Sequence, residues 1–313
     1  MKYIIKKFLT LIITLFIVSL LAFLAFQVIP GDPTTKMLGT EATAEARAAL
    51  RAQLGLDRSV FVRYVDWLTG FITGDFGTSY NYRMPVADML ADKLPITFLL
   101  TMMAFAFTVV LSVPIGVAVG SVKNKFLDMI LTAFNQIMMS VPNFFFGILS
   151  CFIFGIVFKV FTPGQFVSYT ESLKDCLAYL VLPALSIAIP RIAMTVKMLR
   201  SSIINELEQD YVRTAKSRGN RRFSILTRHV LKNSLISVIT FLAVSAAEIM
   251  TGTIIIEQIF AIPGIGRLML ASISNRDFPV VQAIVVIMAA WIVVVNFVAD
   301  LLYQLADPRI RIR

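Results

Sequence analysis

Charged residues are scarce in this chain of 313 residues. Only 15% of the residues are charged, 58% are hydrophobic, and the mean hydropathy is +0.80. A soluble domain needs more charge than this to cover its surface, so the composition indicates a polytopic protein embedded in a lipid bilayer. The chain is basic, with a net charge of +10. Because the basic residues lie in short segments between apolar runs, they are typical of membrane topology signals, and we expect no nucleic-acid partner.

Residues that carry chemistry are equally few. Cys151 and Cys176 lie in or beside apolar runs without a CxxC pair, and His229 is the one histidine. This pattern predicts packing cysteines and neither a disulfide nor a metal site. The sequence has no GxxxxGK[ST] phosphate-binding loop and no pair of catalytic residues. We therefore expect no catalytic residues, no cofactor in this chain and no enzymatic activity of its own.

Long apolar runs dominate the chain, and each is long enough to cross a hydrocarbon core about 30 Å thick. They predict an all-α polytopic membrane protein with six transmembrane helices. The third run is too long for a straight crossing and holds Pro142 and Asn143 near its middle, so we expect a bend there. The fourth contains Pro183 and Pro190, which predict a non-ideal helix. The expected spans are residues 8–29, 96–120, 127–158, 177–199, 235–258 and 282–306.

Charge distribution predicts the orientation and the domains. Most lysines and arginines of the short connecting segments fall on the side that holds both termini, which places both termini in the cytoplasm. Residues 31–95 mix basic and acidic side chains and contain two predicted helices, Glu41–Leu54 and Ser59–Phe71. The predicted domains are an N-terminal transmembrane helix (1–30), an extracytoplasmic helical cap (31–95) and a core of five transmembrane helices (96–313).

A polar and basic segment, residues 201–233, interrupts the core domain between the fourth and fifth spans. Its pattern predicts an amphipathic helix, a turn at Gly219, a cap at Asn220 and a second helix. The apolar stripes expected on the two helices are Ile204, Leu207, Tyr211 and Ala215, then Phe223, Leu226 and Val230. The residues leave two interpretations open. Such a helix can lie in the lipid headgroup layer, or it can dock onto a protein partner.

Several motifs in this chain resemble one family. Asp210-Tyr211-Val212-Arg213-Thr214-Ala215 followed by Gly219 is similar to the "EAA loop" of bacterial ABC importer permeases, as is the stretch Arg228–Asn233 that follows. The segment Gly74-Asp75-x-Gly77 and the segment Phe260-x-Ile262-Pro263-Gly264 resemble the same family. The resemblance spans nearly the whole chain and is to the first-permease branch of the dipeptide, oligopeptide and nickel importers.

This resemblance implies a type I ABC importer permease in the bacterial inner membrane. It implies that the 201–233 loop contacts the ATPase. The partners would be a second homologous permease forming a heterodimer, two ABC ATPase subunits that bind ATP and Mg²⁺, and an extracytoplasmic substrate-binding protein. The residues expected to couple the permease to the ATPase are Glu206, Leu207, Asp210, Tyr211, Arg213, Ala215, Lys216 and Gly219.

Glu248 is an isolated charge in the middle of the fifth span. A carboxylate there costs roughly 2.5 to 3.5 kcal/mol on insertion scales, so it should face a cavity or a partner. A structural hydrogen bond is the alternative role. We select Glu248, Asn143 and Arg191 as candidates for the translocation path.

Taken together, these features predict the permease subunit of an ATP-driven importer of short peptides. An alternative is the same machinery importing nickel, metallophores or opines. An alternative of another class is a stand-alone ion-coupled transporter with Glu248 and Arg191 as coupling residues.

Overall fold

The computed structural model describes residues 2–28, 33–39, 42–53, 55–122 and 124–306. All named elements in these ranges are helices, and Thr78 and Pro85 form an isolated β-bridge. The helices form two compact units, one made of Met1–Thr97 with Pro263–Val294 and the other of Phe98–Ile262 with Val295–Arg313. The ends of the first helix predicted in the 31–95 region, Glu41 and Leu54, lie outside the described residues.

Five described helices are long and apolar enough to cross a membrane, and a bent pair of helices makes a sixth candidate. The all-α class is therefore confirmed, and the six predicted spans correspond to these five helices and the bent pair. The five are α1 (Lys2–Val28), α6 (Leu94–Gly120), α9 (Leu173–Leu207), α12 (Leu231–Ile259) and α14 (Phe278–Ala306).

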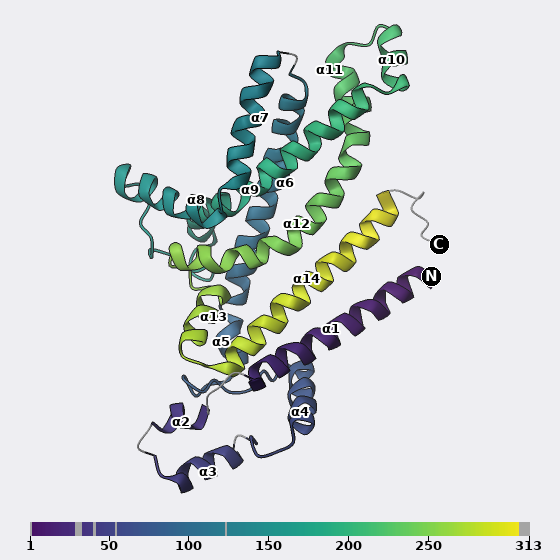
Figure 1. The fold of residues 1–313 in the computed structure, drawn as a ribbon. Helices are drawn as coiled ribbons and strands as arrows, with labels where there is room; N and C mark the ends of the chain where they lie inside the picture. Colours follow the sequence, from purple (N-terminus) through teal and green to yellow (C-terminus); the bar gives the residue numbers. More distant parts are fainter. Residues whose placement is uncertain (1, 29–32, 40–41, 54, 123, 307–313) are drawn as a thin grey trace. The chain divides into compact units, whose positions relative to one another are not determined.

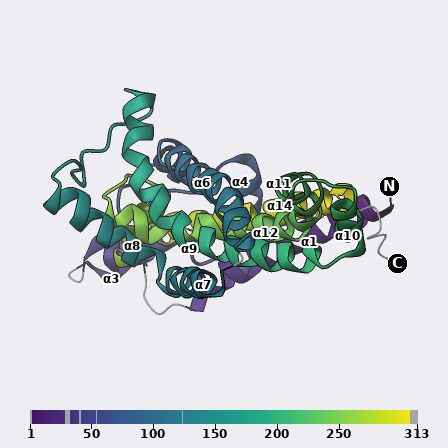
Figure 2. The same cartoon turned by 90° about the horizontal axis from the view of Figure 1, so that it is seen from above.

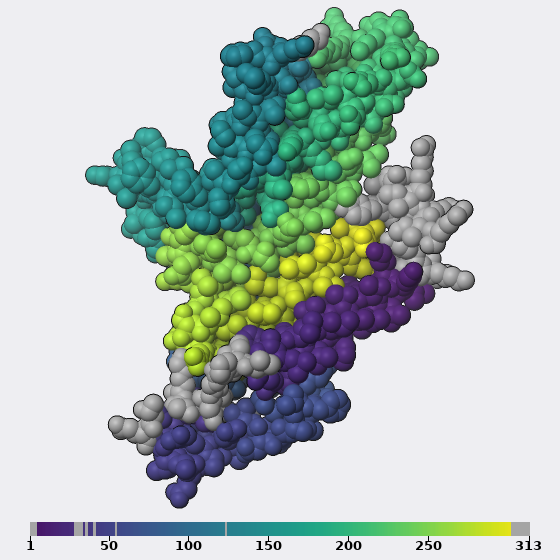
Figure 3. Space-filling view, viewed as in Figure 1, coloured from purple at the N-terminus to yellow at the C-terminus, as the bar shows by residue number. Residues whose placement is uncertain are grey.

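The bend expected at Pro142 is present as a complete break. Helix α7 (Lys125–Ser140) begins after the cap residue Asn124, and α8 (Asn143–Ser150) leaves it at 93° and continues into the π-helical η1 (Cys151–Val157). Pro142 has no N–H to donate to the last turn of α7, so the helix ends there. In the space-filling view α8 projects sideways from α7 (Figure 3).

Helix α9 is the central element of the second unit. It packs most extensively against α12, and also against α8 and α7. The predicted span 177–199 lies within α9, which continues to Leu207 with Pro183 and Pro190 inside it. Neighbouring helices can satisfy backbone groups that a proline frees, which allows prolines within membrane helices. Helix α8 and the segment after α9 lie at opposite ends of this unit (Figures 1 and 2).

Small residues allow α6 to approach α9 closely. A Cβ on Gly116 would lie 2.7 Å from Leu199 Cδ2, and one on Gly120 would lie 3.2 Å from Ile203. Leu199 and Ile203 are fully buried. Glycines at such contacts are characteristic of membrane helix packing, where close backbone approach replaces the hydrophobic driving force.

In the first unit, α4 (Val60–Thr73) packs against α1. Ser59 caps α4, and Gly74 ends it in the left-handed conformation, so the helix predicted over 59–71 is confirmed. Tyr64 is buried and shares a 2.9 Å hydrogen bond with Ser19 of α1. The shorter helices of this unit are α2 (Pro33–Leu38), α3 (Ala44–Gln53), α5 (Val86–Ala91) and α13 (Ile265–Ser274).

A buried carboxylate holds two distant parts of the first unit together. Asp277, between α13 and α14, accepts hydrogen bonds from Ser79 Oγ (2.5 Å) and from the backbone N–H of Tyr80 (2.9 Å). Because a buried carboxylate needs such donors, Asp277 fixes the segment before α5 against the start of α14.

Candidate functional site

The segment between α9 and α12 contains a separate short helix, α10 (Asp210–Ser217). The expected single helix through Ile204 and Ala215 was wrong, because the chain breaks at Glu208 and Gln209 between α9 and α10. As a result Ile204 is exposed, whereas Ala215 is buried as predicted. Val212, which the pattern did not select, is fully buried.

The inner face of α10 belongs to a hydrophobic cluster that it shares with α9, α12 and the segment before α12. Val212 and Ala215 pack with α9 residues and with the segment that leads into α12. Leu207 and Tyr211 are half-buried against the same cluster. Helix α10 is therefore packed as part of the bundle. The buried members contributed by the neighbouring helices are Leu199, Ile203, Ile225, Leu226, Val230, Val238 and Leu242.

Glu206 ties α10 to both neighbouring helices. The Tyr211 hydroxyl donates to its carboxylate at 2.5 Å, and the Asn233 side chain approaches the same oxygen at 3.5 Å. Burial raises the pKa of the Tyr211 hydroxyl, and the hydrogen bond to Glu206 raises it further. Tyr211 therefore stays protonated at neutral pH and remains a donor.

Gly219 makes the turn that follows α10. Its φ is +77°, and the N–H of Asn220 reaches back to Ala215 O at 3.3 Å, which is a glycine helix ending. The expected cap at Asn220 was wrong, because Arg221 precedes α11 (Arg222–Ile225) and no side chain caps it. Phe223 is 75% exposed, contrary to the predicted stripe, and Ile225 takes the buried position. The π-helical η2 (Leu226–Val230) then leads into α12.

The outer face of α10 is charged and open. The side chains of Asp210 and Arg213 are 94% and 75% exposed and form a 3.3 Å ion pair, and Lys216 is exposed beside them. An exposed pair of this kind contributes little to stability. These charges are therefore free to contact another surface.

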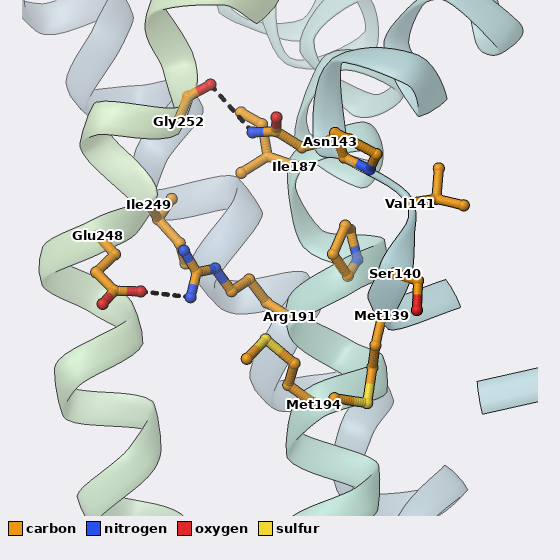
Figure 4. Close-up of a pocket in the computed structure, with 12 residues that line it drawn as sticks. Met139, Ser140, Val141, Asn143, Ile187, Arg191, Met194, Glu248, Ile249 and Gly252 are labelled. Carbon is orange, nitrogen blue, oxygen red and sulfur yellow. Dashed lines mark hydrogen bonds and ion pairs between the residues drawn. The ribbon is translucent and has the colours of Figure 1, made fainter. Parts of the chain in front are cut away.

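A second feature of the same unit is a cavity of about 370 Å³ between α7, α8, α9 and α12. Arg191 of α9 reaches across it, and its guanidinium is paired with the Glu248 carboxylate of α12 (Figure 4). Asn143, the first residue of α8, also lines the cavity. The structure thus brings together the three side chains that the sequence selected for a translocation path.

The break between α7 and α8 forms one wall of this cavity. Asn143 Nδ2 donates to the carbonyl of Gly252 on α12 at 3.3 Å, and a Cβ on Gly252 would lie only 3.0 Å from that nitrogen. Met139, Ser140 and Val141 of the broken segment line the cavity as well (Figure 4). Helix ends with incomplete backbone hydrogen bonding therefore border the Arg191–Glu248 pair.

Another ion pair on α9 was not found from the sequence. Arg200 binds both carboxylate oxygens of Asp128 on α7 at 2.7 Å. Neither residue lines the cavity. The pattern gave no signal for this pair, because the two residues lie far apart in the chain and each has an ordinary position near a helix end.

Two family models match this chain. Residues 112–312 match the binding-protein-dependent transport system inner membrane component, and residues 1–101 match the N-terminal part of such a membrane component. A putative peptide transport system permease protein of Brucella suis is 34% identical, with 98% of each chain covered. A dipeptide transport system permease protein of Bacillus subtilis is 34% identical over 99% of this chain and 98% of its own.

A glutathione transport system permease protein of Salmonella choleraesuis is 33% identical, again over 99% of both chains. These relatives align along nearly the whole length of this chain. The apolar helices long enough to span a membrane agree with these matches. The chain belongs to the family of binding-protein-dependent transport system inner membrane components and is a multi-pass permease subunit of an ABC importer, which works with an ATPase and a binding protein and is not itself an enzyme.

Proposed function

We propose that this permease carries short peptides from an extracytoplasmic binding protein into the cytoplasm. The observation that supports this cargo is the full-length likeness to proteins named as peptide, dipeptide and glutathione permeases. These names favour peptides over the nickel, metallophore and opine alternatives. A family that depends on a binding protein also argues against the stand-alone ion-coupled transporter.

Helix α10 is proposed as the contact to the ATPase. Its charged outer face, with Asp210, Arg213 and Lys216, is open, and its inner face is packed into the bundle. The exposed ring of Phe223 lies on the same loop and adds an apolar contact. Since a packed helix transmits force better than a mobile loop, the headgroup-layer alternative explains less of this arrangement.

Movement of α10 would reach the cavity through two continuous helices. Glu206, Leu207 and Tyr211 join α10 to the end of α9, and Gly219 lets the chain return into α12. Arg191 lies about 24 Å along α9 from Leu207, and Glu248 about 26 Å along α12 from Leu231, at 1.5 Å rise per residue. A push on α10 therefore acts on both sides of the Arg191–Glu248 pair at similar depth.

One copy of this chain supplies half of a pathway in this proposal. A second homologous permease forms a heterodimer with it, and two ATPase subunits bind ATP and Mg²⁺ and contact one loop from each permease. Both termini and the 201–233 loop are then cytoplasmic, and residues 31–95 are extracytoplasmic, in agreement with the positive-inside rule.

Cross-linking tests the proposed docking. Cys151 and Cys176 are replaced by serine, a single cysteine is introduced by Arg213→Cys on α10, and the assembled complex is treated with a short thiol cross-linker. We expect a product containing the ATPase. The matched control is Arg58→Cys, at a similarly exposed arginine of the 31–95 region, which should give none. Equal products from both positions, or none from position 213 in an active complex, would refute the contact.

A further inference from the structure

The ion pair in the cavity joins the two helices that the coupling loop connects. Arg191 and Glu248 are the two ionised side chains that line the cavity among the described residues. The other lining side chains are neutral, and the Glu248 side chain is 52% exposed despite its pairing. An ionised pair at this depth of a membrane protein is costly to keep, which marks it as a functional element.

We propose that this pair recognises the two charged ends of a zwitterionic cargo. The inference rests on the proposed function and names the chemistry by which the path accepts its cargo. The ammonium group of the cargo replaces Arg191 as the partner of Glu248. The carboxylate of the cargo replaces Glu248 as the partner of Arg191. Without cargo the two residues pair with each other and hold α9 and α12 together. The exchange leaves no charge unpaired in either state.

Charge balance makes this arrangement selective. A cargo with only a positive end would separate the pair and leave Arg191 without an anion, and a cargo with only a negative end would leave Glu248 without a cation. Within membrane-spanning helices, a charge that has lost its partner is unfavourable. A molecule that carries both groups avoids the penalty, whatever side chains lie between them.

The broken wall of the cavity, between α7 and α8, also offers partners for charges of both signs. Pro142 has no N–H to donate back to α7, which ends at Ser140, so the last turn of α7 lacks one of its usual backbone hydrogen bonds. Helix α8 begins at Asn143, beside that end. The C-terminus of a helix favours cations and the N-terminus favours anions. Broken membrane helices use these ends to bind charged substrates.

The cavity size fits a small cargo. Its volume of about 370 Å³ lies at the low end of the roughly 300 to 1,000 Å³ typical of small-molecule sites. A dipeptide with its charged ends free matches this space. Both charged side chains have rotatable stems, so they can withdraw from each other without a change in the helices themselves.

The first test measures uptake of radiolabelled dialanine into vesicles that contain the whole complex and its binding protein. The variant Arg191→Gln with Glu248→Gln removes both charges and keeps hydrogen-bonding groups of similar size. We expect at least a tenfold fall in uptake with unchanged assembly, since charge-assisted contacts to both ends of the cargo are lost. The control is Arg200→Gln with Asp128→Asn, the α9 ion pair outside the cavity, which should stay within about twofold of wild type because a neutral pair can replace it. Equal uptake by both double variants would overturn the proposal.

The second test avoids the selectivity of the binding protein. Saturation-transfer NMR compares dialanine with N-acetyl-dialanine amide, which has no charged ends, on the permease–ATPase complex alone. Transfer to free dialanine that the Arg191→Gln/Glu248→Gln variant abolishes supports the proposal, and equal transfer to both peptides or none to dialanine refutes it. If the wild-type complex takes up no peptide at all, the proposed peptide cargo fails instead, and the binding comparison still decides the role of the pair.

Discussion

Gly219 has a φ of +77° and open space around the position of a Cβ. The cost of a side chain there is therefore backbone strain alone. Gly219→Ala should destabilise the loop by about 1 kcal/mol, and Gly219→Val by more, because β-branched residues avoid this conformation. Thermal unfolding of the purified complex measures this effect, together with substrate-stimulated ATP hydrolysis, which should fall in parallel.

Gly219→Asn is the matched control, since asparagine tolerates the left-handed region better than alanine or valine. It should lie between glycine and alanine in stability. If Gly219→Val leaves stability, hydrolysis and transport unchanged, the turn is not required.

At Gly116 the cost of a side chain is a steric clash, whereas at Gly219 it is backbone strain. A Cβ would lie 2.7 Å from Leu199 Cδ2 and 3.1 Å from Leu199 Cβ. We expect Gly116→Ala to destabilise the protein by about 1 to 3 kcal/mol, the range for overpacked cores. Thermal unfolding of a double-mutant cycle with Leu199→Ala checks the cause, because the cost of Gly116→Ala should shrink when Leu199 is truncated. Additive effects would contradict direct contact.

The role and burial of some residues could be predicted from the sequence, and those of others could not. Glu248 could be selected because a charge within an apolar run must find a partner. Its partner Arg191 was selected too, but their pairing depends on how α9 and α12 cross, which local pattern does not contain. The buried position of Val212 was missed for a related reason, since the helical stripe was drawn through a break at Glu208 and Gln209.

At the scale of elements, α10 is held by the hydrogen bond from Tyr211 to Glu206. Tyr211→Phe keeps the ring in the cluster and removes this bond, which contributes about 1 kcal/mol. We expect the complex to assemble and hydrolyse ATP, with less peptide imported for each ATP hydrolysed. Parallel measurements of uptake and phosphate release give this ratio.

The matched control for Tyr211→Phe is Tyr82→Phe, at a tyrosine that is 51% exposed in the first unit. The control should leave the ratio unchanged. If Tyr211→Phe leaves the amount of peptide imported per ATP unchanged, the hydrogen bond from Tyr211 to Glu206 is not needed to couple ATP hydrolysis to transport.

Helix ends that depend on a proline or a glycine could be predicted from the sequence. The break at Pro142 follows from a missing N–H, and the end of α4 follows from the left-handed Gly74. The continuation of α9 through Pro183 and Pro190 was not predictable, because it depends on the helices packed around it. The same holds for α11, whose first turn leaves Phe223 exposed.

At the scale of the whole molecule, composition alone predicted the class, because apolar runs of this length have few stable arrangements outside a membrane. In the proposed mechanism, ATP hydrolysis in separate subunits drives movement of α10, and through it of α9 and α12.

The most direct test is uptake by vesicles that contain this permease with or without the candidate second permease and ATPases. Each preparation receives the binding protein and labelled peptide, with ATP or with an imposed proton or sodium gradient. We expect uptake only from the complete complex with ATP, and loss of that uptake when either the second permease or the ATPases are omitted. Robust uptake by this chain alone, driven by an ion gradient, would contradict it.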